Sequence, residues 1–246
     1  DPGSKVDVVV ARTGNRGTLI GLGRPDSYAC KIDALEHQTT TELKAQVGDE
    51  VLIAGHGGRA HALKAELFDK REFAGYWEYV LDEALFASPA HPQWGGTALI
   101  GRDGKLLGVG SLLVEEKHGE RSVQGNMFVP VDILEPILED LVKRGRPRRA
   151  ARPWLGMYTT DMGARLVVAG LAAGGPADRA GVKLGDVVVA VAGERPQGLA
   201  DLFRRVWALG PAGAEVALTL ARSGKRMDLV LASVDRNDFL KKPQLH

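Results

Sequence analysis

The sequence predicts a mainly β chain with some helix, divided into two domains. Two observations carry this prediction. The first half consists of short β-branched runs separated by glycine-containing turns, such as the buried run at residues 51–54 that ends at Gly55. A helical pattern at residues 132–144 is then followed by an Arg- and Pro-rich stretch, which is typical of a domain boundary near residue 150. The total of 246 residues suits two modest domains.

In the first half, strands are expected wherever β-branched and aromatic residues lie between turn signals. These strands are expected at residues 6–11, 19–23, 28–32, 51–54, 76–80, 98–100 and 106–114. Asp103-Gly104 has the signature of a tight hairpin turn before the last of them. Many short strands of this kind are typical of a barrel or sandwich. The helix at residues 132–144 carries apolar residues at helical spacing, with Lys143 and Arg144 at the end where the dipole favours cations.

The second half combines strands with one strongly patterned helix. Strands are expected at residues 166–168 and 187–191, and a hairpin is expected around Ser223-Gly224-Lys225. The helix is expected at residues 198–209, where apolar side chains share one face. The polar residues 237–246 are expected to form a surface tail.

Composition excludes several classes of function. The net charge of +1 provides no general attraction for nucleic acid or anionic lipid. The basic run at residues 143–149 contains Gly and Pro and lacks aromatic residues, so a solvated linker is favoured over a nucleic-acid patch. No apolar run is long enough to span a bilayer. Residues 1–5 do not form a signal peptide, so any targeting segment is expected to have been removed.

Neither a metal nor a cofactor is expected. The histidines lack the spacing of metal ligands, and the glycine-rich segments at residues 21–23 and 55–59 fit neither the Walker nor the dinucleotide pattern. Cys30 is the only cysteine, so an internal disulfide is excluded. A buried thiol is favoured for Cys30 over a nucleophile paired with His37.

Three segments of the second half carry the most specific signal. In order they are Trp154-Leu155-Gly156-Met157, the run GPADRAGVKLGDVV at residues 175–188, and Asp201-Leu202-Phe203-Arg204-Arg205-Val206. Together and at this spacing they resemble the carboxylate-binding loop, the central segment and the groove helix of a PDZ domain of the bacterial HtrA type. The resemblance covers residues 152–236.

The resemblance implies a site for the free carboxylate of a peptide or protein C-terminus. A carboxylate needs several N–H donors directed at one spot, and a glycine between two apolar residues supplies them while allowing close backbone approach. The donors would be the backbone N–H groups of Leu155, Gly156 and Met157, beside Trp154. The peptide would add as a strand to a sheet edge. The groove helix would shape its side-chain pocket through Leu202, Phe203 and Val206. The alternative is that these apolar residues are simply core.

The first half resembles the nucleophile segment of HtrA-like proteases with a trypsin fold. The family's Gly-x-Ser-Gly-Gly elbow corresponds to Pro92-Gln93-Trp94-Gly95-Gly96, which is followed by the Asp103-Gly104 turn. Patchier similarity extends over residues 45–145. The resemblance implies a degenerate trypsin-like domain at residues 1–145, a linker at 146–151 and the PDZ domain after it.

Two departures remove the chemistry of that elbow. Trp94 stands in place of the nucleophilic serine, and an indole cannot attack a carbonyl. Pro92 stands at the glycine whose N–H forms half of the family's oxyanion hole, and proline has no N–H. Losing one such donor costs ~10²–10³ in rate even in an otherwise intact site. No catalytic residue is therefore expected.

The other parts of a triad are also unassigned. His37, His56 and His61 precede Trp94, but none has the family's Ala-His-Cys context, and the last two are expected to be exposed polar residues. Too little chain precedes Trp94 for a complete first barrel, which is expected to be incomplete or degenerate. One aromatic cluster is expected to pack the barrel, with the wall of a substrate cleft as the alternative: Phe73, Tyr76, Trp77 and Tyr79.

The preferred functional hypothesis is an HtrA-like pseudoprotease that binds peptides or protein C-termini and has a scaffold or chaperone-like role. The alternative is an active HtrA-like serine endopeptidase completed by segments outside this chain. A third hypothesis makes the barrel a support for assembly, because the resemblance implies a homo-oligomer, a trimer. The resemblance also implies a periplasmic or cell-envelope location.

Overall fold

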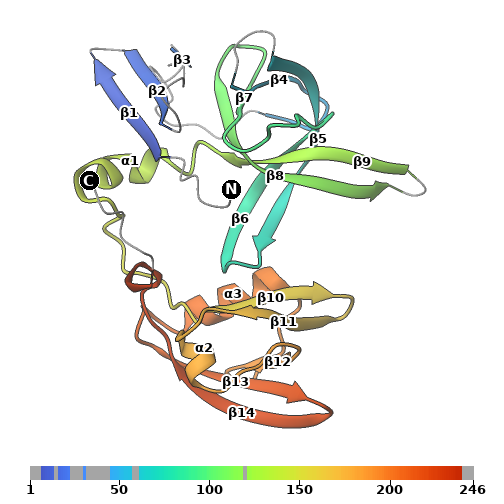
Figure 1. Ribbon diagram of the computed structural model, residues 1–246, viewed down its shortest axis with the longest axis vertical. Coiled ribbons are helices and arrows are strands. Elements are labelled where there is room, and N and C mark those ends of the chain that lie inside the picture. Colours follow the sequence, from blue (N-terminus) through green and yellow to red (C-terminus); the bar gives the residue numbers. More distant parts are fainter. Residues whose placement is uncertain are drawn as a thin grey trace. The chain divides into compact units, whose positions relative to one another are not determined.

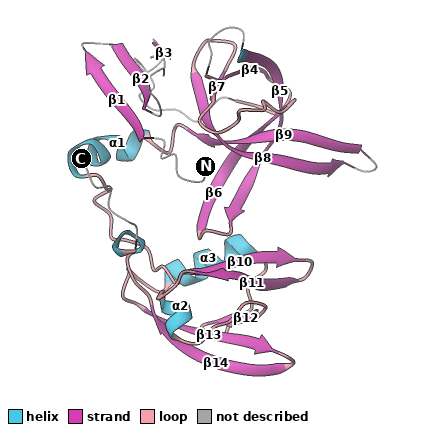
Figure 2. Ribbon diagram, viewed as in Figure 1, coloured by secondary structure: helices cyan, strands magenta, loops and turns pink. Residues whose placement is uncertain are grey.

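The computed structural model describes residues 7–13, 16–22, 30–31, 45–56, 61–118 and 121–239 and consists mainly of strands (Figure 2). The chain divides into two compact units. The first comprises residues 1–72 and 82–147, and the second comprises residues 73–81 and 148–246. The short segment at residues 73–81 therefore belongs with the C-terminal part of the chain, although its neighbours on both sides belong to the first unit.

The first unit begins with a small antiparallel sheet in the order β1-β2-β3. Its strands are β1 (Asp7–Thr13), β2 (Arg16–Leu22) and β3 (Cys30–Lys31). These are the strands that the structure describes before β4.

The remaining strands of the first unit form a six-stranded barrel in the order β4-β5-β6-β9-β8-β7 (Figure 1). They are β4 (Glu50–Ala54), β5 (Ala62–Gly75), β6 (Tyr79–Ser88), β7 (Ala98–Ile100), β8 (Leu106–His118) and β9 (Arg121–Pro130). β7 pairs back onto β4, with Ile53 opposite Leu99. Val51 and Ile53 are buried while Leu52 between them is exposed, which is the period-two alternation of a half-buried strand. The core of this barrel also contains Leu67, Leu85 and Phe128.

The helix predicted at residues 132–144 is present but shorter. Helix α1 spans Glu135–Arg144, because a proline in its first turn fixes the start, and Gly145 ends it with a left-handed backbone. Ile133, Leu134 and Val142 are exposed, and no residue of α1 is buried. The amphipathic pattern thus overstates the burial of this helix.

The second unit is a five-stranded antiparallel sheet in the order β10-β11-β12-β13-β14, with β10 and β14 at its edges. Its elements are β10 (Met157–Met162), β11 (Arg165–Leu171), α2 (Pro176–Arg179), β12 (Val187–Val191), α3 (Leu199–Ala208), β13 (Glu215–Arg222), β14 (Lys225–Ala232) and the short 3-10 helix η3 (Arg236–Asp238). One core joins the sheet to α3 through Val168, Val188, Leu218, Leu202 and Phe203. The predicted helix and the hairpin around Gly224 are confirmed.

Two predictions about residues 73–80 are wrong. Residues 76–78 are not part of a strand but form the turn between β5 and β6. The segment that carries the aromatic cluster groups with the second unit rather than with the barrel, and Tyr76 lies edge-on to Tyr158 of β10 at 6.2 Å between ring centroids. Aromatic and β-branched composition favours a strand but does not exclude a turn whose residues contact a distant segment.

Within the described residues, none of the helices is sufficiently long and apolar to traverse a lipid bilayer.

Candidate functional site

The predicted carboxylate-binding loop is a tight connection that leads into β10. Trp154 forms a two-hydrogen-bond bridge with Val234, with both N–O distances at 3.1 Å. Gly156 has φ of +66°, and a Cβ atom there would lie 3.0 Å from both Ala172 Cβ and the Trp154 ring. Both the backbone angle and the space therefore require glycine at this position.

The carbonyl groups of this loop are fixed by the rest of the second unit. Leu155 O accepts a hydrogen bond from Ala177 N at 2.9 Å, and Gly156 O accepts one from Ala172 N at 2.9 Å. The loop backbone is thereby held in one orientation, and its N–H groups remain available for another acceptor.

That acceptor is the side chain of Glu78. Leu155 N donates to Glu78 Oε2 at 3.1 Å, and Met157 N donates to Glu78 Oε1 at 2.9 Å. The N–H of Gly156 also stabilises the charged carboxylate. Sequence reasoning missed Glu78, but the three donors that it predicted converge on a single carboxylate.

The Glu78 carboxylate is enclosed even though the residue as a whole is only half-buried. Burial raises the pKa of Glu78 to about 7, against the opposing effects of the three loop N–H groups and of the charge on Arg236. The loop thus tolerates a carboxylate in a site from which most water has been removed.

Strand β10 follows the loop and contacts helix α3. β10 is an edge strand, so one row of its backbone groups has no partner strand within the sheet. Leu202, Phe203 and Val206 of α3 are between 1% and 3% exposed and belong to the core of the second unit. All three are therefore core residues, which is the alternative that the sequence left open.

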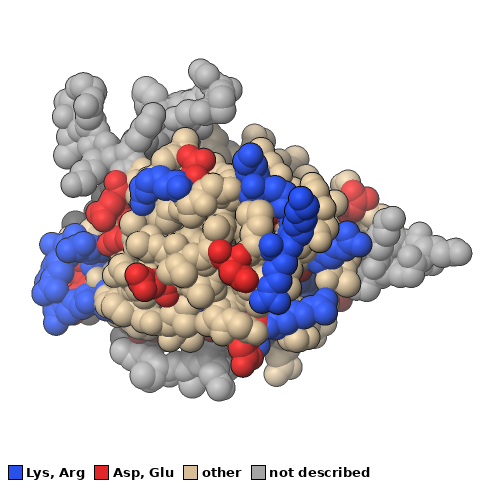
Figure 3. Space-filling view, turned by 90° about the horizontal axis from the view of Figure 1, so that it is seen from below, with Lys and Arg blue, Asp and Glu red and all other residues tan. Residues whose placement is uncertain are grey.

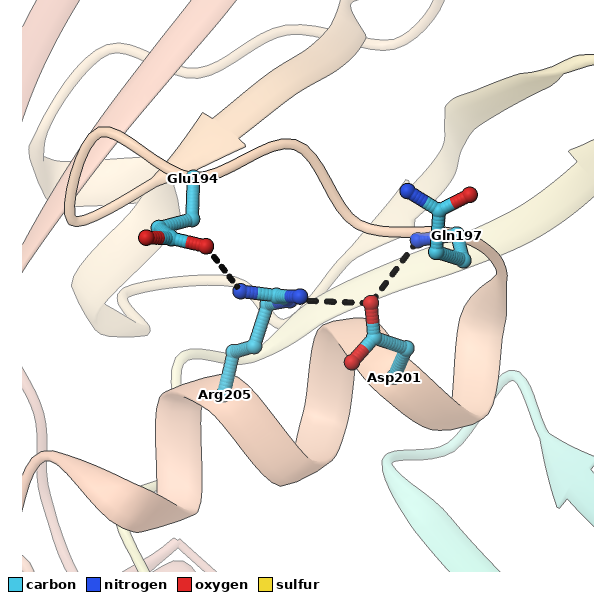
Figure 4. A network of polar contacts seen from close by, with 4 residues as sticks. All are labelled: Glu194, Gln197, Asp201 and Arg205. Atoms are coloured by element: carbon cyan, nitrogen blue, oxygen red, sulfur yellow. Dashed lines mark hydrogen bonds and ion pairs between the residues drawn. The ribbon is translucent and has the colours of Figure 1, made fainter.

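A polar network holds the first turns of α3 against the preceding loop (Figure 4). Asp201 Oδ2 accepts hydrogen bonds from Gln197 N and Arg205 Nε, each at 2.8 Å. Arg205 also pairs with Glu194 at 3.0 Å. The Asp201 carboxyl has a lowered pKa, mainly because of its hydrogen bond to Arg205. These contacts fix the helix that borders the groove.

A hollow of about 530 Å³ lies at the end of β10 that is distant from the loop. Asp161 of β10, Arg165 of β11, and Arg195 and Gly198 before α3 contribute to its lining. On the face shown in Figure 3, basic and acidic side chains both occur and much of the surface is uncharged.

The nucleophile elbow keeps its backbone shape in the first unit. Gly96 N donates to Gly110 O at 2.8 Å, and Gly110 N donates to Thr97 O at 2.7 Å. The buried Thr97 hydroxyl donates to Trp94 O at 2.9 Å. Trp94 is half-buried, while Pro92, Gly95 and Gly96 are exposed. The elbow thus presents an indole rather than a hydroxyl.

His91, which the sequence analysis overlooked, lies beside this elbow. It is 4% exposed, and its backbone N–H donates to Asn126 Oδ1 at 2.6 Å. Gln93 N donates to His91 Nδ1 at 3.1 Å, so the ring proton belongs on Nε2, which lies 2.9 Å from His61 O. Both ring nitrogens are occupied by backbone groups, which indicates a structural role.

The other candidates are not assembled into a catalytic site. His56 and His61 are exposed, as predicted. The Ser88 hydroxyl donates to Gln124 O at 2.9 Å. His37 and the side chain of Cys30 lie outside the described residues. Among the residues that the structure describes, no group of three or more His, Cys, Asp or Glu is arranged to hold a metal ion.

Comparisons with known proteins place the second half of the chain among PDZ domains. Residues 167–222 match the model of the PDZ domain family. The chain is 32% identical over 134 residues to a probable periplasmic serine endoprotease DegP-like from Rhizobium meliloti, covering 50% of this chain and 25% of that protein. It is 25% identical over 154 residues to the serine protease Do-like HtrA of Bacillus subtilis, covering 56% of this chain and 33% of that protein.

These matches span only a quarter to a third of the length of the two curated relatives. Among solved structures, the HtrA-type protease AlgW with a decapeptide has a TM-score of 0.49 and 19% identity, covering 93% of this chain and 76% of that chain.

Proposed function

Because this chain belongs to the HtrA-like family and contains a PDZ domain, we propose that it captures the free C-terminal carboxylate of peptides or proteins at the loop formed by Leu155, Gly156 and Met157. One observation carries this proposal: Leu155 N and Met157 N both donate to a single carboxylate in the structure. A loop that holds a side-chain carboxylate in this way has the donors that a chain terminus requires.

The bound peptide would extend along β10 as an additional strand. An edge strand offers its free N–H and C=O groups to an incoming chain, and main-chain hydrogen bonds then supply affinity without regard to sequence. The core residues Leu202, Phe203 and Val206 would set the depth of the pocket for the last side chain. The hollow lined by Arg165 and Arg195 would receive residues further from the peptide end.

We further propose that the chain acts without proteolysis, as a scaffold or a chaperone-like partner. This rests on Trp94 and Pro92, which leave the elbow with its backbone shape but without a nucleophile and with one fewer N–H donor. The alternative, an active serine endopeptidase, needs a serine and a base from segments outside this chain. A periplasmic or envelope location is proposed from the names of the relatives, and a trimeric assembly from the family resemblance of the sequence.

Peptide binding tests the first proposal. A fluorescein-labelled decapeptide with a free C-terminal valine should bind at least ten-fold more tightly than its C-terminal amide, because the amide removes the charged acceptor. The measurement is fluorescence anisotropy titration. Equal affinities for the two peptides would exclude carboxylate capture by the loop.

Serine labelling tests the second proposal. A fluorophosphonate probe reacts with activated serine hydroxyls, so the chain should remain unlabelled while an active HtrA-like protease is labelled in parallel. Intact-mass analysis would detect a single adduct. An adduct on any serine of this chain would refute the pseudoprotease assignment and favour the active endopeptidase.

A further inference from the structure

We propose that Glu78 is a built-in competitor of the peptide ligand: the turn between β5 and β6 inserts this side chain into the carboxylate-binding loop and keeps the site closed until a chain terminus displaces it. The inference rests on the proposed function of the loop and adds its regulation. Both the turn and the loop belong to the second compact unit.

The turn reproduces the two features of a bound chain end. Its carboxylate accepts from Leu155 N and Met157 N with both oxygens, at 3.1 and 2.9 Å. Its flanking apolar residues, Ala74 and Val80, pack against the core that contains Met157 and the residues of α3. A negative head next to an apolar side chain is the pattern that a PDZ groove would recognise in a C-terminal residue.

The turn also contacts the edge strand. Tyr76 meets Tyr158 of β10 edge-on at 6.2 Å between ring centroids, and its ring lies 4.0 Å from that of Trp77. The turn is therefore a neighbour of the strand to which a peptide would add. Displacement of Glu78 would have to move this turn as a unit.

Glu78 has an unfavourable backbone conformation, which its contact with the loop offsets. Residues 76–78 form a three-residue turn closed by a hydrogen bond from Glu78 N to Gly75 O at 3.1 Å. Glu78 has φ of +64°, a left-handed conformation that such turns normally give to glycine or asparagine. A glutamate in this position is unfavourable for the turn itself, so the carboxylate contact accounts for its orientation.

The contact is poised to be reversible. Removing the Glu78 carboxylate from water opposes its charged form and raises its pKa to about 7. A chain terminus that entered the loop would meet the same N–H donors as Glu78, so the two carboxylates would compete for one site.

The experiment compares the wild-type chain with Glu78→Gly, Glu78→Gln and Glu66→Gln. Glycine suits the left-handed backbone and removes the carboxylate, whereas glutamine keeps the shape of the side chain and removes its charge. Glu66 is an exposed glutamate of β5 and serves as the matched control. Each chain is titrated with the free-carboxylate decapeptide and its amide, and hydrogen exchange of the Leu155 and Met157 amides is followed by NMR without peptide.

Glu78→Gly should bind the free-carboxylate peptide at least ten-fold more tightly than wild type, and its Leu155 and Met157 amides should lose protection. Glu78→Gln mimics the protonated carboxyl, which docks best, so both quantities should stay near their wild-type values. Glu66→Gln should change neither quantity. If both Glu78 variants bind the peptide with wild-type affinity and still prefer the free carboxylate over the amide, Glu78 is not a competitor of the ligand. Carboxylate capture by the loop would then still stand. If the amides of Glu78→Gly lose protection but the peptide binds no better than its amide, the contact of Glu78 with the loop is only structural. That result would overturn both proposals.

Discussion

The carboxylate-binding loop and the nucleophile elbow are both glycine-containing turns that orient backbone groups, but only the loop keeps what its chemistry needs. In the loop, Leu155 and Met157 direct their N–H groups at one carboxylate. In the elbow, Gly96 and Gly110 maintain the turn, while Pro92 supplies no N–H and Trp94 no hydroxyl. Backbone shape and chemical competence are therefore separable.

This difference follows from the chemical groups that each site uses, which are main-chain groups in the loop and side chains in the elbow. Capture of a carboxylate uses main-chain donors, so it survives any substitution that preserves the backbone. Acyl transfer needs a particular nucleophile and a base at hydrogen-bond distance, so one substitution removes it. The elbow of this chain is best understood as a packing element of the barrel.

The largest effect is expected from Gly156→Val. A β-branched side chain is disfavoured at φ of +66° and would collide with Ala172 and the Trp154 ring. Binding of the free-carboxylate peptide should fall below detection, and the second unit should lose about 2–4 kcal/mol of stability. Peptide titration and urea unfolding would measure the two effects.

Gly224→Val is the matched control for that substitution. Gly224 lies in the hairpin between β13 and β14 and has φ of +77°, but a Cβ atom there would meet nothing within 4 Å. It should cost about 1–2 kcal/mol from backbone strain alone and leave peptide affinity unchanged. If both variants lost binding equally, strain rather than the shape of the loop would explain the result.

The next largest effect is expected from pH, which should change the docking of Glu78 in the loop and leave the elbow unaffected. The Glu78 pKa of about 7 in the docked turn exceeds the ordinary value of 4.5, so the docked state binds a proton more tightly than the released state. Docking should therefore weaken as pH rises from about 4.5 to about 7, by at most roughly 3 kcal/mol, and then level off.

The charged group that faces Glu78 from another element is Arg236, and arginine keeps its charge across this range. The surrounding phenols are Tyr76, Tyr79 and Tyr158; burial raises the pKa of Tyr79, so it stays neutral. Protection of the Leu155 and Met157 amides, corrected for intrinsic exchange, should fall between pH 5 and pH 7. The same profile in Glu78→Gln would assign the titration to another group.

A smaller effect, confined to stability, is expected at the elbow. A Cβ atom on Gly110 would overlap Trp94 O and Thr97 Oγ1, so Gly110→Ala should destabilise the first unit by about 2 kcal/mol. Gly95→Ala is the control, because a Cβ atom there meets nothing within 4 Å. Neither variant should alter peptide affinity, and a change with Gly110→Ala would show that the elbow contributes to binding.

The sequence located the features that depend on short-range patterns. The order of three motifs predicted the loop and helix α3. Gly156 is required in the structure by its left-handed backbone and by its closeness to Ala172 and Trp154, whereas the reason expected from the sequence was close approach to a ligand. The strand at residues 51–54 followed from alternation and turn residues alone. The proposed loss of elbow chemistry remains a prediction from two residues, Trp94 and Pro92, because a nucleophile is defined by one side chain.

The features that the sequence did not reveal depend on contacts between distant residues. Glu78 meets donors 77 and 79 positions away, and no glycine or asparagine marks its left-handed turn. Residues 76–80 are rich in aromatic and β-branched side chains, which favour a strand, so the sequence predicts no turn there. His91 was overlooked because its partners, His61 and Asn126, are brought together only by the barrel.

Glu78 also has a consequence for which ligands the loop would register. A site occupied by its own side chain binds an external ligand with an affinity reduced by the fraction of time the site stands open. That fraction is encoded in the chain and does not depend on how many chain ends surround it. The turn would therefore set a threshold for occupancy of the loop. C-termini that bind weakly or are scarce would leave Glu78 in place, and only those that bind strongly or accumulate would displace it.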